Sequence, residues 1–184
     1  MKKHLSLLLV VLAFSFNLMA QQTETKTETK EANPADVASI DSIMRAVYDV
    51  ISGDAGQKRD WDRFRTLFHK DARMIAVGMN PQTKTVGARV LSPEDYVARN
   101  EPFFAKEGFH EREIARRADV YGNIAQVFST YAAYRKADDK QPFMRGINSF
   151  QLLNDGKRWW VVTIYWQAET PENPLPKEYL KSKK

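Results

Sequence analysis

The stretch RWWVVTIYWQA, residues 158–168, decides the fold of this 184-residue chain. As a β-strand it sends alternate side chains to opposite faces of a sheet. The two resulting sets are Trp159, Val161, Thr163, Tyr165 and Gln167 on one face, and Trp160, Val162, Ile164 and Trp166 on the other. Both sets contain large apolar side chains, so both faces must be covered. We expect helices to cover one face and a second copy of the chain to cover the other, making a homodimer.

Three more strands precede this one, at residues 110–120, 124–135 and 143–153. Short polar turns separate the four strands, and strands joined by short turns pair antiparallel. Two earlier strands, at residues 73–79 and 85–91, flank a turn at Asn80-Pro81.

Helices are expected mainly before the long strands. Asn33 and Pro34 start a helix whose apolar residues recur every three or four positions until Gly53 ends it. A second, shorter helix starts near Asp60, and a third starts at Ser92 and should end before Pro102. Helices followed by a meander of strands indicate an α+β fold with helices on one face of the sheet.

The N-terminus has the order of a secretory signal peptide. Two lysines precede an apolar run, and small residues end it at Ala20, so we predict cleavage near Ala20 and a secreted or periplasmic protein. The alternative for this apolar run is an uncleaved membrane anchor. No later segment is long and apolar enough to span a bilayer. Residues 21–34 are predicted to be a flexible linker, and residues 35–184 a single domain with a basic tail.

Composition excludes several classes of function. The chain has no cysteine, which excludes disulfides, thiolate metal sites and a cysteine nucleophile. The formal net charge is +5, but the excess of lysine lies at the chain ends, so a basic face for nucleic acid is not expected. No phosphate-binding loop, dinucleotide motif or serine nucleophile elbow is present, and no cofactor is predicted.

The few histidines give the candidates for acid–base chemistry. His69 lies two residues before Asp71, and a carboxylate can orient an imidazole to act as a general base. The structural alternative is a turn in which Asp71 caps backbone amides. His110 faces either a pocket or solvent at the end of its strand. The only plausible pool of metal ligands is His69, Asp71, His110 and Glu113, without the usual spacing, so no metal is predicted.

Charged residues alternate along the strand from residue 110. Glu111, Glu113, Arg112, Arg116 and Arg117 are interpreted as solvated or cross-strand pairs. Alternatively, one inward arginine, Arg112 or Arg145, holds an anionic ligand.

Several motifs resemble those of the nuclear-transport-factor-2-like superfamily, which includes SnoaL-like cyclases and ketosteroid isomerases. The motifs are LFHKDARM at residues 67–74 and GINSFQLL at 146–153, followed by NDG and RWWVV at 158–162. Residues 122–131 and 173–176 are similar to an uncharacterised secreted branch. The resemblance implies a curved, antiparallel-rich sheet wrapped around three N-terminal helices, a cystatin-like cone with an apolar pocket.

The resemblance also implies roles for particular residues. Trp159 and its set would face inward, and Trp160, Val162, Ile164 and Trp166 would form the dimer interface. The leading hypothesis is a small apolar or amphipathic ligand in a pocket lined by Tyr48, Trp61, Met74, Tyr131, Thr163 and Tyr165. One alternative is an isomerase, cyclase or dehydratase that uses His69 as base, Asp71 to orient it and Tyr131 as donor. Another is an envelope module that binds a different protein through the outer sheet face.

Overall fold

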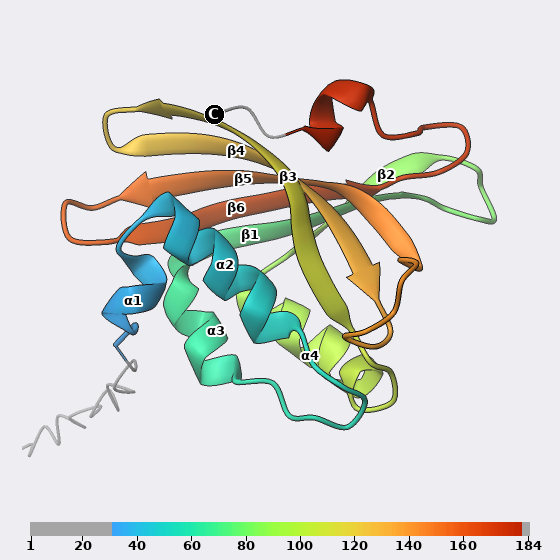
Figure 1. Ribbon diagram of the computed structural model, residues 1–184, viewed down its shortest axis with the longest axis horizontal. Coiled ribbons are helices and arrows are strands. Elements are labelled where there is room, and N and C mark those ends of the chain that lie inside the picture. The colour runs from blue at the N-terminus through green and yellow to red at the C-terminus, as the bar shows by residue number, and fades with distance from the viewer. Residues whose placement is uncertain (1–30, 182–184) are drawn as a thin grey trace, which may run out of the picture.

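The computed structural model describes residues 31–181 of the protein. The predicted signal peptide and most of the predicted linker lie outside these residues. Within them, helices cover one face of a six-stranded sheet, and the C-terminal segment crosses the other face (Figure 1).

The sheet has the strand order β2-β1-β6-β5-β4-β3. The strands are β1 (Phe68–Met79), β2 (Val86–Leu91), β3 (His110–Tyr121), β4 (Ile124–Tyr134), β5 (Met144–Asn154) and β6 (Trp159–Ala168). The last four form the predicted antiparallel meander, and β1 joins it by pairing parallel to β6. The strand β1 begins five residues earlier than predicted, directly after a helix.

The first predicted helix is in fact two. Helix α1 (Pro34–Val37) ends at Ala38, and α2 (Ile40–Ile51) starts anew with Ser39 as its N-cap. The Ser39 side chain accepts from the backbone amide of Ser42, and the Ser42 hydroxyl accepts from that of Ser39. This reciprocal capping box satisfies amides that a fresh helix start exposes, so the prediction of one continuous helix was wrong.

Helix α3 (Trp61–Leu67) starts at the predicted cap, Asp60. Helix α4 (Pro93–Phe104) starts at Ser92 as predicted but contains Pro102 in its last turn. The prediction that it ends before Pro102 was wrong, since a proline so near the C-terminus removes only one hydrogen bond. The helix closes beyond it, where the Ala105 amide donates to the Glu101 carbonyl.

The core lies between the helices and the inner face of the sheet. Its least exposed side chains come from both layers, among them Ile43 and Phe64 from the helices and Val127 and Val161 from the strands. This is the cone-shaped α+β architecture predicted from the sequence.

A β-bulge in β6 changes which side chains face the core. Leu152 of β5 pairs with Val161, whereas the preceding residue Gln151 pairs with Thr163, so Val162 is an extra residue. A one-residue shift reverses the facing of every later side chain. Trp159 and Val161 therefore point inward as predicted, but beyond the bulge the inward residues are Ile164 and Trp166.

The predicted dimer face must be corrected accordingly. Ile164 is 5% exposed and belongs to the core, and Trp166 packs against it, so neither is available to a second copy. The outer face of β6 instead carries Trp160, Val162, Thr163 and Tyr165, the last of them 47% exposed.

The chain itself covers part of this outer face. The Arg158 guanidinium lies 3.6 Å from the centre of the Trp160 ring, and Asp155 accepts from the Trp160 indole N–H at 2.8 Å. Farther along the sheet, the 3-10 helix η1 (Lys177–Leu180) packs Tyr179 against Phe128 of β4. The second face of the sheet is thus covered in part without a partner.

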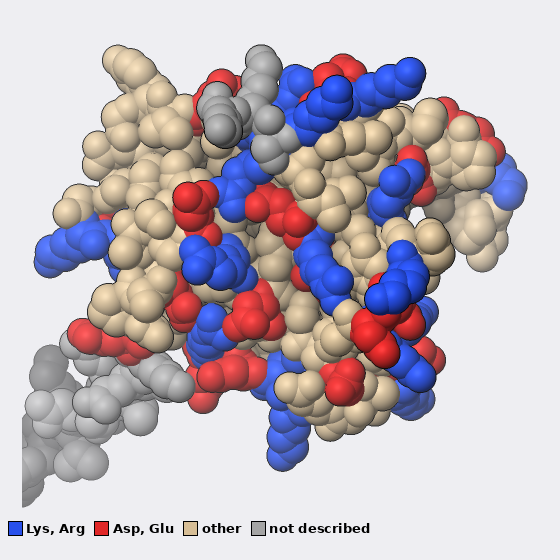
Figure 2. Space-filling view, in the orientation of Figure 1, with Lys and Arg blue, Asp and Glu red and all other residues tan. Residues whose placement is uncertain are grey.

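Acidic and basic side chains are interleaved over the face shown in Figure 2. That face presents no extended region of one charge. In the part of the chain that the structure describes, no helix is both long and apolar enough to cross a membrane.

Because of the bulge, substitutions at two neighbouring residues should lower the free energy of unfolding by different amounts. Ile164→Ala removes an enclosed core side chain and should lower the free energy of unfolding by about 3 kcal/mol. Tyr165→Ala should cost less than about 1 kcal/mol, because the side chain is half exposed. Urea denaturation of both variants measures this. Equal costs, or a larger cost for Tyr165→Ala, would contradict the bulged register.

Candidate functional site

The interior of the cone contains a cavity of about 150 Å³. Helices α2 and α4 close it on one side and strands β3 to β6 on the other. Aromatic rings from α3, α4, β5, β6 and the residue before β3 dominate its wall. The lining residues are Val47, Ile51, Phe64, Met74, Tyr96, Asn100, Phe103, Phe104, Phe109, Glu111, Tyr131, Asn148, Phe150, Ile164 and Trp166.

A chain of hydrogen bonds forms the polar part of this wall and runs behind it. The Asn148 amide nitrogen donates to a Glu111 carboxylate oxygen at 3.1 Å and to the Tyr48 hydroxyl at 3.1 Å. Tyr48 and Ser129 lie 2.6 Å apart through their hydroxyl oxygens, and the Ser129 hydroxyl donates to Glu113 at 2.5 Å. We call these five residues the polar chain; it joins α2 to strands β3, β4 and β5.

From Asn148 onward, the hydroxyl donors of the polar chain point toward Glu113. Because Ser129 gives its only proton to Glu113, the Tyr48 hydroxyl must donate to Ser129. The two amide hydrogens of Asn148 are both used, one toward Tyr48 and one toward Glu111. The chain ends on Glu113, whose carboxylate pairs with Arg116 at 2.5 Å.

The two glutamates of the polar chain differ in their neighbours. Glu113 has Arg116, which also pairs with the exposed Asp41. Glu111 has Asn148 as its hydrogen-bond donor and keeps part of its surface open to the cavity. Removal from water raises the pKa of Glu111 to about 7, against a smaller lowering by the Asn148 hydrogen bond.

Tyrosine hydroxyls surround this carboxyl group. Burial and the nearby Glu111 raise the pKa of Tyr96 and of Tyr131, and of Tyr48 as well. All three therefore stay protonated at neutral pH. The Tyr48 hydroxyl already donates to Ser129, and those of Tyr96 and Tyr131 remain potential hydrogen-bond donors. A carboxyl group that titrates near neutrality beside neutral hydroxyls can bind a polar group or exchange a proton.

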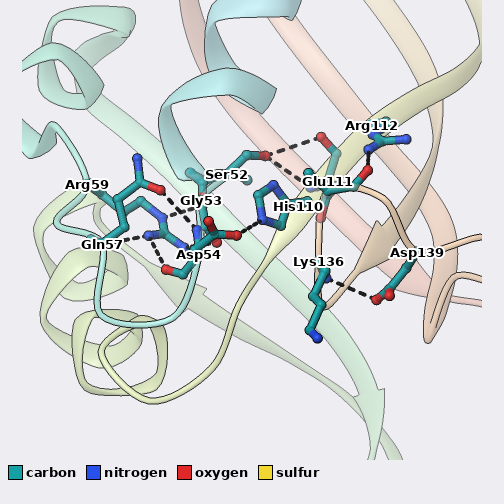
Figure 3. Close-up of polar contacts among 12 residues, drawn as sticks. Ser52, Gly53, Asp54, Gln57, Arg59, His110, Glu111, Arg112, Lys136 and Asp139 are labelled. Atoms are coloured by element: carbon teal, nitrogen blue, oxygen red, sulfur yellow. Dashed lines mark hydrogen bonds and ion pairs between the residues drawn. The ribbon is translucent and has the colours of Figure 1, made fainter.

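The backbone at Glu111 is held by the end of α2, as Figure 3 shows. The Ser52 hydroxyl accepts from the Glu111 amide at 3.0 Å and lies 3.3 Å from the Glu111 carbonyl oxygen. Gly53 forms a backbone bridge with Phe109. These contacts fix the start of β3, and with it the side of the sheet to which Glu111 points.

Arg59 closes the loop after α2 (Figure 3). Its guanidinium donates to the carbonyls of Ile51, Gly53, Asp54 and Gln57 and packs over the ring of Phe104. The side chain is only 7% exposed and is committed to this loop. Arg59 therefore stabilises the cavity wall and does not pair with Glu111.

The predicted ligand-binding residues divide into three groups. Met74 and Tyr131 line the cavity, as the pocket hypothesis requires. Tyr48 belongs to the polar chain and Trp61 stacks on Phe104 at 5.9 Å between ring centres, but neither is among the residues that line the cavity. Thr163 and Tyr165 lie on the outer face because of the β6 bulge, so their assignment to the pocket was wrong.

The predicted acid–base group is not assembled. His69 packs edge-on against Trp160, which belongs to the outer face, at 6.2 Å between ring centres. Asp71 is exposed and pairs with Lys70 at 2.5 Å. Tyr131 lies inside the cone, so His69 and Asp71 do not meet it and cannot serve it as base and orienting group.

The remaining charged candidates are also engaged elsewhere. His110 pairs with Asp54 at 3.0 Å, Arg112 donates to the carbonyl of Ala137, and Arg145 pairs with Glu169 at 2.8 Å. Neither arginine is among the residues that line the cavity. In residues 31–181, no group of three or more potential metal ligands gathers.

A second hollow, of about 310 Å³, lies on the outer face of the sheet. The segment 169–176 forms one side of it, and Ile147, Ser149 and Tyr165 contribute to the other. Its one charged residue, Glu169, is already used by Arg145 and by the backbone amide of Leu175. The enclosed polar groups therefore favour the cone interior as the functional site.

Glu111 was not among the predicted site residues. The interpretation as a solvated or cross-strand charge was wrong for Glu111, which lines the cavity; Glu113 forms an ion pair, but with Arg116 of its own strand. The alternation of side chains along a strand could have predicted this position, because Glu111 lies on the same face as Phe109, an aromatic residue two positions earlier. The aromatic residues of α4 were likewise not assigned to the pocket.

Solved structures confirm the fold. A protein from Nostoc punctiforme described as having a cystatin-like fold is 11% identical over 80% of this chain and 100% of its own, with a TM-score of 0.54. A cystatin-like protein from Caulobacter vibrioides is 13% identical over 73% of this chain and 90% of its own, with a TM-score of 0.51. A protein from Kribbella flavida is 13% identical over 72% and 90%, with a TM-score of 0.52.

These likenesses establish a cystatin-like fold for this chain. No protein-family model and no curated protein matches the sequence. Sequence identities of 11–13% support a shared fold but do not establish a shared activity, so the function depends on the residues of the site.

The raised pKa of Glu111 predicts a pH-dependent effect of Glu111→Gln. The folded protein holds the Glu111 proton up to about pH 7, whereas the ordinary value is 4.5. Stability from this neutral carboxyl is complete below pH 4.5 and is lost as pH rises to 7. Glu111→Gln, which cannot ionise, should therefore be more stable than the parent at pH 8 by up to about 3 kcal/mol.

At pH 4.5 the two proteins should have nearly equal stability. Guanidinium denaturation at pH 4.5, 6 and 8 measures the difference. A difference that does not change with pH would contradict the neutral state assigned to Glu111.

Proposed function

We propose that this protein binds a small apolar or amphipathic molecule inside its cone. The observation that carries the proposal is the cavity in which an aromatic wall meets the Glu111 and Asn148 side chains. Ligand sites in proteins are concave, mostly apolar and supplied with a few polar groups that fix orientation. The cone interior has each of these properties.

The size of the cavity limits the ligand. A cavity of about 150 Å³ is the volume that holds one benzene-sized ring. A fused multi-ring molecule would need the wall to move. We therefore propose a ligand with a single ring or a comparably short chain.

The polar end of the cavity supports an amphipathic ligand over a purely apolar one. Removing the polar groups of Glu111 and Asn148 from water costs free energy, and hydrogen bonds to these groups offset that cost. A ligand with one polar group at the end of an apolar body would satisfy Glu111 while filling the aromatic part.

We further propose that the protein acts after export and as a homodimer. The N-terminal sequence supports export, since it has the order of a signal peptide. The half-exposed Tyr165 and the partly covered Trp160 on the outer sheet face support contact with a second copy. The C-terminal segment leaves this part of the face open.

Toluene is a suitable probe of the cavity, because it has one ring and no charge. At tenfold excess over its Kd, toluene should raise the Tm of the protein by about 4 °C. Val47→Phe, which fills the cavity from α2, should abolish the rise. Differential scanning calorimetry measures both.

Val90→Phe is the matched control, since Val90 lies on β2 and is 58% exposed. This variant should respond to toluene as the parent does. No response of the parent, or an equal response of Val47→Phe, would contradict binding inside the cone.

A second candidate function is proton transfer at carbon, which the environment of Glu111 favours. A carboxyl group with a pKa of about 7 in an apolar site is matched to a general base at neutral pH. It would remove a proton next to a carbonyl and return it to another carbon. The neutral hydroxyl of Tyr131 or Tyr96 would stabilise the enolate oxygen.

The conversion of 3-cyclohexenone to 2-cyclohexenone tests this candidate with a single-ring substrate. Because the base must be ionised, kcat/KM should rise about tenfold from pH 6 to a plateau above pH 7. Glu111→Gln should lower it by about a hundredfold or more. Ultraviolet absorbance of the conjugated product follows the reaction, and equal rates for parent and variant would exclude Glu111 as the base.

A further inference from the structure

Aromatic rings make up much of the cavity wall. Rings from three elements, α3, α4 and β6, and from the segment before β3 reach it: Phe64, Tyr96, Phe103, Phe104, Phe109 and Trp166. Several of them pack on one another, for example Phe104 on Phe109 at 5.4 Å between ring centres. The face of an aromatic ring is electronegative and attracts a cation within about 6 Å.

The charge on the cavity wall is negative. Of the lining residues, Glu111 alone carries a full charge when ionised. The nearby arginines are committed to other groups, Arg59 to loop carbonyls and Arg116 to Glu113 and Asp41. The cavity therefore combines electronegative ring faces with one carboxylate that has no cationic partner among its lining residues.

The polar chain leaves this carboxylate able to accept more. One Glu111 oxygen accepts from Asn148, and the other hydrogen of the Asn148 amide goes to Tyr48. Donors farther along the chain point away from Glu111, toward Glu113. A positive charge brought by a ligand would compensate Glu111 from the open side.

We propose that the ligand of the cone is a compact organic cation with a single ring, its charge beside Glu111 and its ring against the aromatic wall. This inference rests on the proposed function, since it assigns a charge to the ligand of the same cavity. The aromatic faces would stabilise the positive charge, and the carboxylate would neutralise it. An anion would be repelled by both.

Glu111 is the group through which pH should control this binding. The groups that face it are Tyr48 from α2, Tyr96 from α4, Tyr131 from β4 and Asn148 from β5. On its own strand, His110 is paired with Asp54, and Glu113 with Arg116. The three tyrosines have a raised pKa and stay neutral between pH 6 and 8, so they add no charge over this range.

N-methylpyridinium and toluene form the matched pair of probes. They have nearly the same shape, and N-methylpyridinium keeps its charge at every pH. Because the cation favours ionised Glu111, its affinity should rise about tenfold between pH 6 and 8. The affinity for toluene should stay constant or fall over the same range. Isothermal titration calorimetry on the mature chain measures both.

Glu111→Gln should bind N-methylpyridinium roughly tenfold more weakly than the parent at pH 8, and without the rise with pH. It should bind toluene at least as well as the parent. Glu101→Gln makes the same change on an exposed part of α4 and should behave as the parent does. Residual pH dependence in Glu111→Gln would assign the titration to another group and overturn the role of Glu111.

The outcomes separate this inference from the proposed function. If toluene binds but N-methylpyridinium does not, or binds Glu111→Gln as tightly as the parent, the cationic ligand is overturned and the apolar pocket stands. If neither probe binds, both proposals fail. Cation binding that rises with pH in the parent and in Glu101→Gln, but not in Glu111→Gln, supports the inference.

Discussion

The inside of the cone depends on the polar chain that runs from Asn148 through Tyr48 and Ser129 to Glu113. Asn148, Tyr48 and Ser129 are each at most 7% exposed, and leaving such a group without its partner costs about 1–3 kcal/mol. The chain fixes α2 against three strands, because Tyr48 comes from the helix and its partners come from the sheet. It also holds the Asn148 and Glu111 side chains together on the wall of the cavity.

Burial makes Glu111 a destabilising residue above neutral pH, where its carboxyl group is ionised. Its carboxylate receives one hydrogen bond from Asn148, which offsets only part of the cost of removing it from water. Residues that lower stability are expected where function requires them, since most of a fold is otherwise locally consistent. A bound group that compensates Glu111 would recover this cost, so ligand binding and stability are coupled through one side chain.

Much of the fold followed from local sequence signals. Short turns bounded β3 to β6 to within about one residue, and the caps at Asp60 and Ser92 located two helices. The facing of the last strand was predicted correctly only as far as Val161. The extra residue, Val162, is neither a glycine nor a proline, so no local sequence signal predicts the bulge. The family resemblance predicted the inward direction from Trp159 alone, by strict alternation, and so could not reveal the bulge. The errors at Thr163, Tyr165, Ile164 and Trp166 all come from this one insertion.

A second bulge explains why the site has one unneutralised charge. In β3, Glu113 pairs with Tyr131 and Ala115 with Thr130, so Ile114 is the extra residue. Strict alternation would place Arg116 on the face opposite Glu113; the insertion brings the two to the same face, where they form an ion pair. Glu111 and Glu113 face the same interior, but only Glu113 receives this cation. Two carboxyl groups with such different neighbours can have different roles. Glu113 accepts the last hydrogen bond of the polar chain and pairs with Arg116, whereas Glu111 is the titratable group on the cavity wall.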